Sequence, residues 1–174
     1  MRPQDIVILL KVITIPRKDW QYRDLASSLI MSTSEVSESL IRSHMAGLID
    51  ESRRKVHRRS LLEFLEHGLH YVFPQAPGTM VTGTATAHSH PYFAKFFNSE
   101  LNYVWPFENG HMRGLSITPL HKSVPEAVKN DERLHLLLSA LDIIRVGRVR
   151  EMEKAINVLH KEINHESSTE HYTN

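Results

Sequence analysis

The sequence predicts a mainly α-helical protein, with a helical N-terminal region, an irregular middle segment and C-terminal helices. In the first and last thirds, apolar residues recur every three or four positions, which is typical of amphipathic helices. Between Pro74 and Pro125 lie six of the eight prolines and four of the seven glycines, so irregular structure is expected there. This segment is also rich in aromatic residues, whereas disordered chains are poor in them. We therefore divide the chain into residues 1–72, residues 73–164 and a flexible tail at 165–174.

A first helix is expected to begin around Pro3 and Asp5, because proline is tolerated in the first turn and an acidic side chain is favourable at the positive end of a helix. Its apolar stripe consists of Ile6, Leu9, Leu10 and Ile13. Pro16 ends this helix, and Trp20 leads into a shorter second helix over residues 22–29. We interpret Trp20 as a core anchor, and the alternative is an exposed ring that stacks on DNA.

The third helix has the clearest local signals in the chain. Ser32 can cap it, and Glu35 three residues later completes a capping box. Val36 and Leu40 share the side that packs on another helix, and Gly47 supplies the left-handed residue at the C-terminus. The opposite side carries side chains of mixed hydrogen-bonding character, as contact with base edges requires: Ser34, Ser37, Glu38, Ile41 and Arg42. A short helix, a turn and a capped helix form the helix-turn-helix pattern.

The densest charge cluster of the sequence follows the third helix, where five of the seven residues 53–59 are Lys or Arg. These cations are Arg53, Arg54, Lys55, Arg58 and Arg59. Beside a helix that contacts bases, they are expected to neutralise DNA phosphates and to release counterions. The alternative is a solvated loop that is merely rich in charge.

Residues 5–59 resemble the winged helix-turn-helix domain of bacterial transcriptional regulators, in the broad sense that includes the MarR family. The matching pieces are residues 22–26, 31–37 and 46–49, which occur in the right order and at the right spacing. The resemblance implies that the third helix lies in the major groove and that a wing reaches the DNA backbone. Such regulators usually have a clear two-stranded wing, whereas only residues 48–56 are available here, so the wing must be short.

The middle of the chain is expected to fold against the helices. A fourth helix is predicted over residues 60–71, and in winged-helix regulators such a helix often leads to a dimerisation or sensor part. The segment after it should form loops and short strands, one of them at residues 113–117. Its aromatic side chains are expected to pack in the core, or alternatively to line a ligand pocket: Tyr92, Phe93, Phe96, Phe97, Trp105 and Phe107. His88 and His90 are followed at once by Pro91, and with twelve histidines in the chain chance proximity to His111 is easy, so we predict no metal site.

The C-terminal part predicts a short helix at residues 124–129, then a longer one that begins at Asp131 and ends at Gly147. Beyond Gly147 the apolar positions follow the three–four spacing of a coiled-coil seam: Val149, Met152, Ile156, Leu159 and Ile163. We expect this seam to form a homodimer interface, and the alternative is packing against the preceding helix of the same chain. Charged residues around Gly147 are interpreted as a solvated or inter-helix ion network, or else as a second basic surface: Asp142, Arg145, Arg148, Arg150 and Glu151.

Composition narrows the function classes. The net charge of the 174 residues is +1, so nucleic-acid binding needs a local basic patch. The chain has no cysteine, which excludes disulfides and thiolate metal sites and fits a cytoplasmic protein. The apolar run at residues 6–15 is interrupted by Lys11 and is too short to span a membrane. Glycine-rich phosphate loops, G-x-S-x-G and H-E-x-x-H motifs are all missing, so we predict neither an enzyme nor a cofactor.

These observations predict a sequence-specific regulator of transcription that binds double-stranded DNA as a homodimeric repressor. A second hypothesis is that the protein is the antitoxin of a toxin–antitoxin pair. The winged helix would then bind a partner toxin protein, and the antitoxin would also repress its own operon. A third is a ligand-sensing regulator with the aromatic segment as its pocket. The genomic neighbour and a thermal-shift screen against small molecules would separate these three hypotheses.

Overall fold

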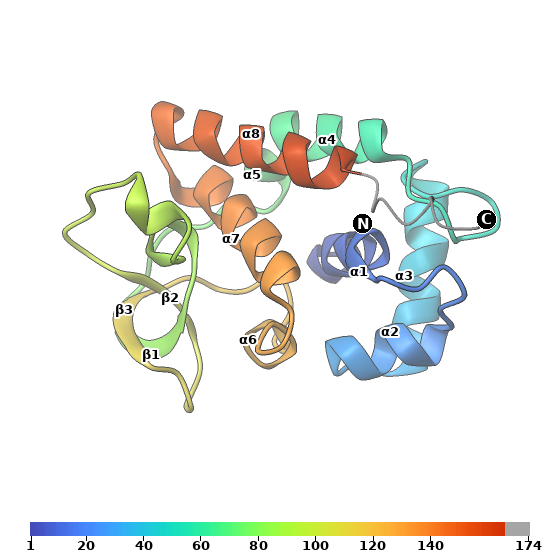
Figure 1. The fold of residues 1–174 in the computed structure, drawn as a ribbon, viewed down its shortest axis with the longest axis horizontal. Helices are drawn as coiled ribbons and strands as arrows, with labels where there is room; N and C mark the ends of the chain where they lie inside the picture. Colours follow the sequence, from blue (N-terminus) through green and yellow to red (C-terminus); the bar gives the residue numbers. More distant parts are fainter. Residues whose placement is uncertain (166–174) are drawn as a thin grey trace, which may run out of the picture.

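The computed structural model describes residues 1–165, and within this range it holds eight α-helices and three short β-strands (Figure 1). The helices are α1 (Pro3–Thr14), α2 (Tyr22–Leu29), α3 (Thr33–Met45), α4 (Arg58–His67), α5 (Leu69–Val72), α6 (Val124–Ala127), α7 (Glu132–Val146) and α8 (Val149–Asn164). The strands are β1 (Met80–Ala85), β2 (Tyr103–Pro106) and β3 (Met112–Ser116), with 3₁₀ turns η1 (Ala87–Ser89) and η2 (Phe93–Lys95). The prediction of a mainly α-helical chain is confirmed. Of the predicted flexible tail, residues 166–174 lie outside the described residues.

Helix α1 lies at the centre of the molecule, between α3 on one side and α7 on the other (Figure 1). It is buried over nearly all of its surface, from Asp5 through Ile13, with only Lys11 partly exposed. A helix that is apolar all round belongs in a core rather than at a surface. Trp20 follows it with 3% of its surface exposed, so its interpretation as a core anchor is confirmed.

The three strands form a small mixed sheet on the far side of α7 from α1, α2 and α3 (Figure 1). β1 pairs antiparallel with both β2 and β3, and β2 pairs parallel with β3, which closes the three strands on one another. Gly83 permits this closure, because a Cβ there would lie 1.9 Å from the carbonyl oxygen of Trp105. The predicted strand at 113–117 is β3, which begins one residue earlier.

Most of the aromatic side chains of the middle segment pack as expected. Phe93 and Trp105 are almost completely buried, and Tyr92, Phe97 and Phe107 are half-buried. Phe96 differs, since 53% of its surface is exposed and the ammonium of Lys154 lies 3.8 Å from its ring centroid. The aromatic residues from Tyr92 to Phe97 thus form a cluster that is partly core and partly surface.

A buried ion pair on α7 fastens the middle segment. The Nη1 atom of Arg145 donates to Oδ1 of Asp142 at 2.8 Å, and these side chains are 5% and 2% exposed. Oδ2 of Asp142 accepts hydrogen bonds from the Trp105 indole at 2.6 Å and from the Thr86 hydroxyl at 2.7 Å. Arg145 also donates to the carbonyl oxygen of Phe73 at 2.9 Å. Five groups from four separate parts of the sequence therefore meet at one point inside the protein.

This pair corrects the interpretation of the charges around Gly147. Asp142 and Arg145 were expected in a solvated or inter-helix network, but burial and long-range hydrogen bonds make them part of the core. Arg148 and Arg150 are exposed at the start of α8. Glu151 lies beside them and pairs with Nε2 of His88 at 3.0 Å, so it joins α8 to η1.

The predicted fourth helix is two helices. α4 begins at Arg58 and ends at His67, and Gly68 separates it from the single turn of α5. A Cβ at Gly68 would lie 2.9 Å from the ring of Phe64, so glycine permits the close approach of that ring. α8 packs on α7 and on α4, and both α4 and α8 run along the upper edge in Figure 1. Among the helices of residues 1–165, none combines the length and the apolar character needed to cross a bilayer.

Candidate nucleic-acid interface

Helix α3 begins and ends where its local signals predict. The backbone N–H of Glu35 donates to Oγ of Ser32 at 3.1 Å, and the backbone N–H of Ser32 donates to Oε2 of Glu35 at 2.8 Å. The Ser32 hydroxyl also donates to Oε2 of Glu35 at 2.9 Å, and the backbone and hydroxyl hydrogen bonds from Ser32 to this carboxylate lower the pKa of Glu35, so it stays ionised at the positive end of the helix. At the other end Gly47 has a φ of +74°, as a left-handed C-terminal residue requires.

The inner face of α3 consists of Val36, Ser39, Leu40 and Ser43, which are buried, and α3 packs on α1 and α2. The residues opposite this face are 34, 38, 41 and 45, because successive helical residues are separated by about 100°. Ser34, Glu38, Ile41 and Met45 are all exposed, with 43% of Ile41 and 82% of Met45 accessible to solvent. We call these four residues the outward line of α3.

The structure places the five predicted base-contacting residues differently. Ser34, Glu38 and Ile41 belong to the outward line, and Ser37 is half-buried beside it. Arg42 turns away, because Nη2 donates to Oδ1 of the buried Asp5 at 2.7 Å and Nε donates to Oδ2 at 3.1 Å. Since this two-point ion pair holds the guanidinium against α1, we correct the assignment of Arg42 from base contact to a link between α1 and α3.

Met45, the more exposed of the two apolar residues in the outward line, was not among the residues predicted from the sequence. Its spacing of four residues from Ile41 is the signal that would have found it, since residues i and i+4 share a helix face. Both residues are apolar and lie outside the core cluster of the protein. The helix therefore presents two exposed apolar side chains beside Ser34 and Glu38.

The loop that follows α3 is organised by Asp50. Its Oδ1 accepts the backbone N–H groups of Arg54 and Lys55 at 2.8 and 2.9 Å, and its Oδ2 accepts the Ser52 hydroxyl at 2.5 Å. These hydrogen bonds lower the pKa of Asp50 to about 2, with the backbone N–H of Lys55 as the largest contribution. A single antiparallel bridge between Ile49 and Val56 closes the loop. We call residues 50–55 the Asp50 loop.

The five predicted phosphate-binding cations divide into three groups. Arg54, which is exposed, and Arg58, which is half-buried, donate to backbone carbonyl groups of the chain: Arg54 to that of Trp20, with its guanidinium 4.3 Å above the Trp20 ring, and Arg58 to that of Ile163. Arg59 is 94% exposed and forms a surface ion pair with Glu63 at 3.2 Å. Arg53 is half-buried and Lys55 is exposed on the Asp50 loop, and the charged groups of these two residues form no ion pair with residues 1–165.

The region after the sheet also reaches α3, which the sequence did not predict. Nε2 of His121 lies 3.7 Å from Oε1 of Glu35, and His121 is held in place by the hydroxyl of Ser123 at 2.7 Å. The next residue, Lys122, is exposed, and its charge contributes to the lowered pKa of Glu35. Cations therefore stand beside both ends of α3, with Lys122 at the N-terminus and the Asp50 loop after the C-terminus.

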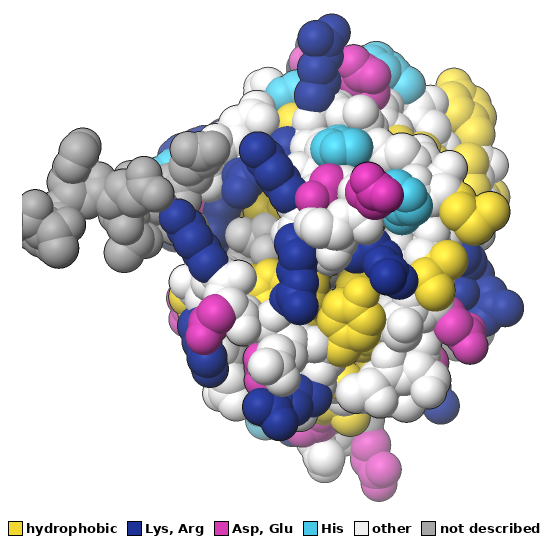
Figure 2. All heavy atoms as spheres, turned by 90° about the vertical axis from the view of Figure 1, so that its right-hand side faces the viewer, with side chains coloured by type: hydrophobic (Ala, Val, Ile, Leu, Met, Phe, Trp, Pro, Cys, Tyr) yellow, Lys and Arg dark blue, Asp and Glu magenta, His cyan; other side chains and the backbone are white. Residues whose placement is uncertain are grey.

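Figure 2 shows the side of the molecule on which α2, α3 and the Asp50 loop lie. Lys and Arg side chains are spread over this face, and a hydrophobic patch lies among them near its centre. Asp, Glu and His side chains are interspersed, so the face is locally basic without being uniformly charged.

The predicted dimer seam is divided between core and surface. Leu159 and Ile163 are 1% and 0% exposed within the single chain, Met152 and Ile156 are half-buried, and Val149 is 72% exposed. α8 uses this side to pack on α7 and α4. The assignment of Leu159 and Ile163 to a dimer interface is therefore wrong, because both side chains are already buried within the single chain and cannot contact a partner. The homodimer itself stays a prediction.

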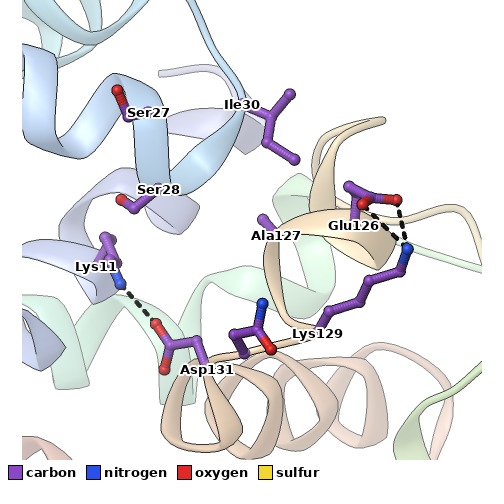
Figure 3. A pocket seen from close by; sticks show the side chains of 9 residues that line it. Lys11, Ser27, Ser28, Ile30, Glu126, Ala127, Lys129 and Asp131 are labelled. Carbon is purple, nitrogen blue, oxygen red and sulfur yellow. Dashed lines mark hydrogen bonds and ion pairs between the residues drawn. The ribbon is translucent and has the colours of Figure 1, made fainter.

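A cavity of about 310 Å³ lies between α2 and the segment around α6 (Figure 3). Lys11 and Asp131 point toward one another on one side of it, with 2.6 Å between Nζ and Oδ2, and Lys129 binds Glu126 on the other side. These charges are paired with one another, and the cavity is lined from α1, α2 and the 126–131 segment. We therefore leave it outside the interface around α3.

A second cavity, of about 590 Å³, is lined by His90 and His135. Burial, assisted by His135, lowers the pKa of His90 to about 3, and burial also lowers the pKa of His135. Their ring centroids are 4.4 Å apart, and Nε2 of His135 donates to the carbonyl oxygen of Ala85 at 2.7 Å. Within the described part of the chain, no three His, Asp or Glu side chains are placed to hold a metal ion.

Comparisons with protein-family models, with curated proteins and with solved structures gave no match for this chain. The geometry around α3 is therefore the basis for the function proposed below.

Proposed function

We propose that the protein is a regulator of transcription that binds double-stranded DNA in a sequence-specific way. The arrangement of α1 to α4 and the Asp50 loop is then a winged helix-turn-helix with a short wing. One observation carries the proposal: α3 is capped, is packed on its inner face, and exposes the outward line between cations at both of its ends. A helix with this exposure can enter the major groove, which is wide enough to admit it.

The positions of the charged residues support different roles for different residues on the DNA. Arg53 and Lys55 on the Asp50 loop and Lys122 beside the N-terminus of α3 are proposed to bind phosphates. Ser34, Ser37, Glu38 and Ile41 are proposed to contact base edges. Asp50 is proposed as a positioning residue, because its three hydrogen bonds fix the loop that carries Arg53 and Lys55.

The direct test selects bound sequences from a random pool of double-stranded DNA with the purified protein. A shared sequence among the selected molecules supports the proposal, and a pool that stays random contradicts it. Light scattering of the complex then gives the number of chains per site. Two half-sites about one turn of DNA apart are expected if the regulator is a homodimer.

The phosphate contacts are tested by salt dependence. Changing Arg53 and Lys55 together to Ala should reduce the slope of log K against log salt by roughly 1.8, because each lost phosphate contact removes about 0.9. Arg150→Ala is the matched control, since Arg150 is exposed at the start of α8, away from α3. An unchanged slope in the double variant would mean that the Asp50 loop is only a solvated loop.

A further inference from the structure

The outward line of α3 is unusual in its two apolar members. Ile41 and Met45 are 43% and 82% exposed, although α3 packs its other apolar residues, Val36 and Leu40, completely. No other described residue covers either side chain enough to bury it. A pair of exposed apolar residues on one helix face points to a partner that offers apolar groups at matching positions.

The surroundings of this pair favour DNA as that partner. Cations of the Asp50 loop and Lys122 stand beyond the two ends of the helix, which complements the phosphates on either side of a groove. Glu38 lies on the same line with its side chain 65% exposed, and a carboxylate is repelled by phosphates. The outward line therefore fits against the base edges on the floor of a groove better than against the phosphates of the DNA backbone.

The floor of the major groove has one apolar group, the C5 methyl group of thymine. Other base edges present donors and acceptors, which Ile41 and Met45 cannot satisfy. The two residues are four positions apart, so they are separated by about 6 Å along the helix axis. This distance corresponds to roughly two base-pair steps of 3.4 Å.

We propose that Ile41 and Met45 contact the methyl groups of two thymines about two base pairs apart, and that these contacts contribute to sequence specificity. The inference rests on the proposed function and deepens it, because it names the base that this face of α3 selects. Ser34 and Glu38 then contact the neighbouring polar base edges from the same line.

The test uses duplexes obtained by selection, in which single thymines are replaced by deoxyuridine. This replacement removes the methyl group and keeps every hydrogen-bonding group of the base. At fixed salt, each of two replacements should weaken binding of the wild-type protein about fourfold, which corresponds to the loss of about 0.8 kcal/mol for one buried carbon. Ile41→Ala should lose sensitivity to one replacement, and Met45→Ala to the other.

Two control variants make the result specific. Leu101→Ala removes an apolar side chain just before β2 whose exposure, 47%, is close to the 43% of Ile41, and it should respond to deoxyuridine as the wild type does. Lys55→Ala should weaken binding to the thymine duplex and to the deoxyuridine duplex by the same factor. Because Ile41 and Met45 are exposed, their variants should fold, which circular dichroism checks.

Four results would overturn the inference. Selected sites without thymine, or equal binding of thymine and deoxyuridine duplexes, would leave the proposed DNA-binding function standing and refute the methyl contact. Ile41→Ala or Met45→Ala could instead change the number of chains in light scattering and leave deoxyuridine sensitivity intact, which would assign the pair to a protein interface. A protein that binds no DNA in the selection would refute both the function and the inference.

Discussion

In α1, α2 and α3, the carboxylate of an acidic residue in the first turn accepts a hydrogen bond from the backbone N–H of the N-cap residue, which lies three positions earlier in the sequence. Asp5, Asp24 and Glu35 do this at 2.7, 2.7 and 2.8 Å. The segment from Phe73 to Thr118 is fastened differently, since it is bound to Arg145 and Asp142 by hydrogen bonds that span up to 72 residues. The first region is thus specified by neighbours in sequence, and the second by contacts that form only in the folded chain.

The difference also concerns energy. A helix cap contributes about 1 kcal/mol, whereas breaking a buried ion pair by removing one partner costs about 3–5 kcal/mol. The features that are easiest to find in the sequence are therefore not the ones on which stability depends most. Variants in the two regions should separate these effects.

The largest effect is expected at Asp142. Asp142→Ala should lower the free energy of unfolding by about 3–5 kcal/mol, because Arg145 is left charged and buried without its partner. The Trp105 indole and the Thr86 hydroxyl lose their acceptor as well. Urea unfolding followed by fluorescence measures the change. Asp142→Asn keeps an acceptor oxygen and should lose less, and a loss below about 1 kcal/mol for Asp142→Ala would contradict the importance of the pair.

The ion pair between Arg42 and Asp5 is the corresponding long-range contact in the first region, and its loss should lower the free energy of unfolding by a smaller amount. Arg42→Ala should cost about 3 kcal/mol, because Asp5 remains buried as an unpaired carboxylate. Arg42 itself is 23% exposed, so less of the pair is shielded from water than at Asp142. Glu38→Ala is the control, since it removes only an exposed partner of Arg42 at 3.8 Å. If Arg42→Ala left the stability unchanged and impaired DNA binding, the assignment of Arg42 to base contact would be restored.

These contacts explain what sequence analysis could and could not predict. The start of α1, the cap of α3, the turn at Gly47 and the break at Gly147 all depend on residues within a few positions, and each was predicted. The pairing of Arg42 with a residue 37 positions away has no local signal. The charges Asp142 and Arg145, spaced i and i+3, look the same on a solvated helix as in a core. Likewise, the three–four spacing on α8 predicts a packed face without telling whose helix it packs against.

Acid should affect the two regions at different pH. The pKa of His90 is lowered from 6.5 to about 3, so its stabilising contribution is complete above pH 6.5 and is lost as the pH falls toward 3. In that interval the unfolded chain binds a proton that the folded chain does not, which changes stability by up to about 1.4 kcal/mol per pH unit. His90→Gln should therefore reduce the loss of stability between pH 7 and pH 5, measured by urea unfolding.

The control for His90 comes from the other region. The pKa of Asp50 is lowered from 3.8 to about 2, so its contribution is present above pH 3.8 and is lost only as the pH falls toward 2. Asp50→Asn should accordingly leave the pH dependence between 7 and 5 as it is in the wild type. Equal pH profiles for His90→Gln and the wild type would mean that His90 does not stay neutral in the folded chain.

The smallest effect is expected at the cap of α3. Ser32→Ala should lower the free energy of unfolding by about 1 kcal/mol, because the backbone N–H of Glu35 loses its acceptor. The carboxylate of Glu35 still accepts the backbone N–H of residue 32, which limits the loss. Ser32→Asn, which restores a capping oxygen, should recover most of it. If Ser32→Ala proved as costly as Asp142→Ala, local signals would be as important for stability as the buried ion pair, and the contrast between the two regions would fail.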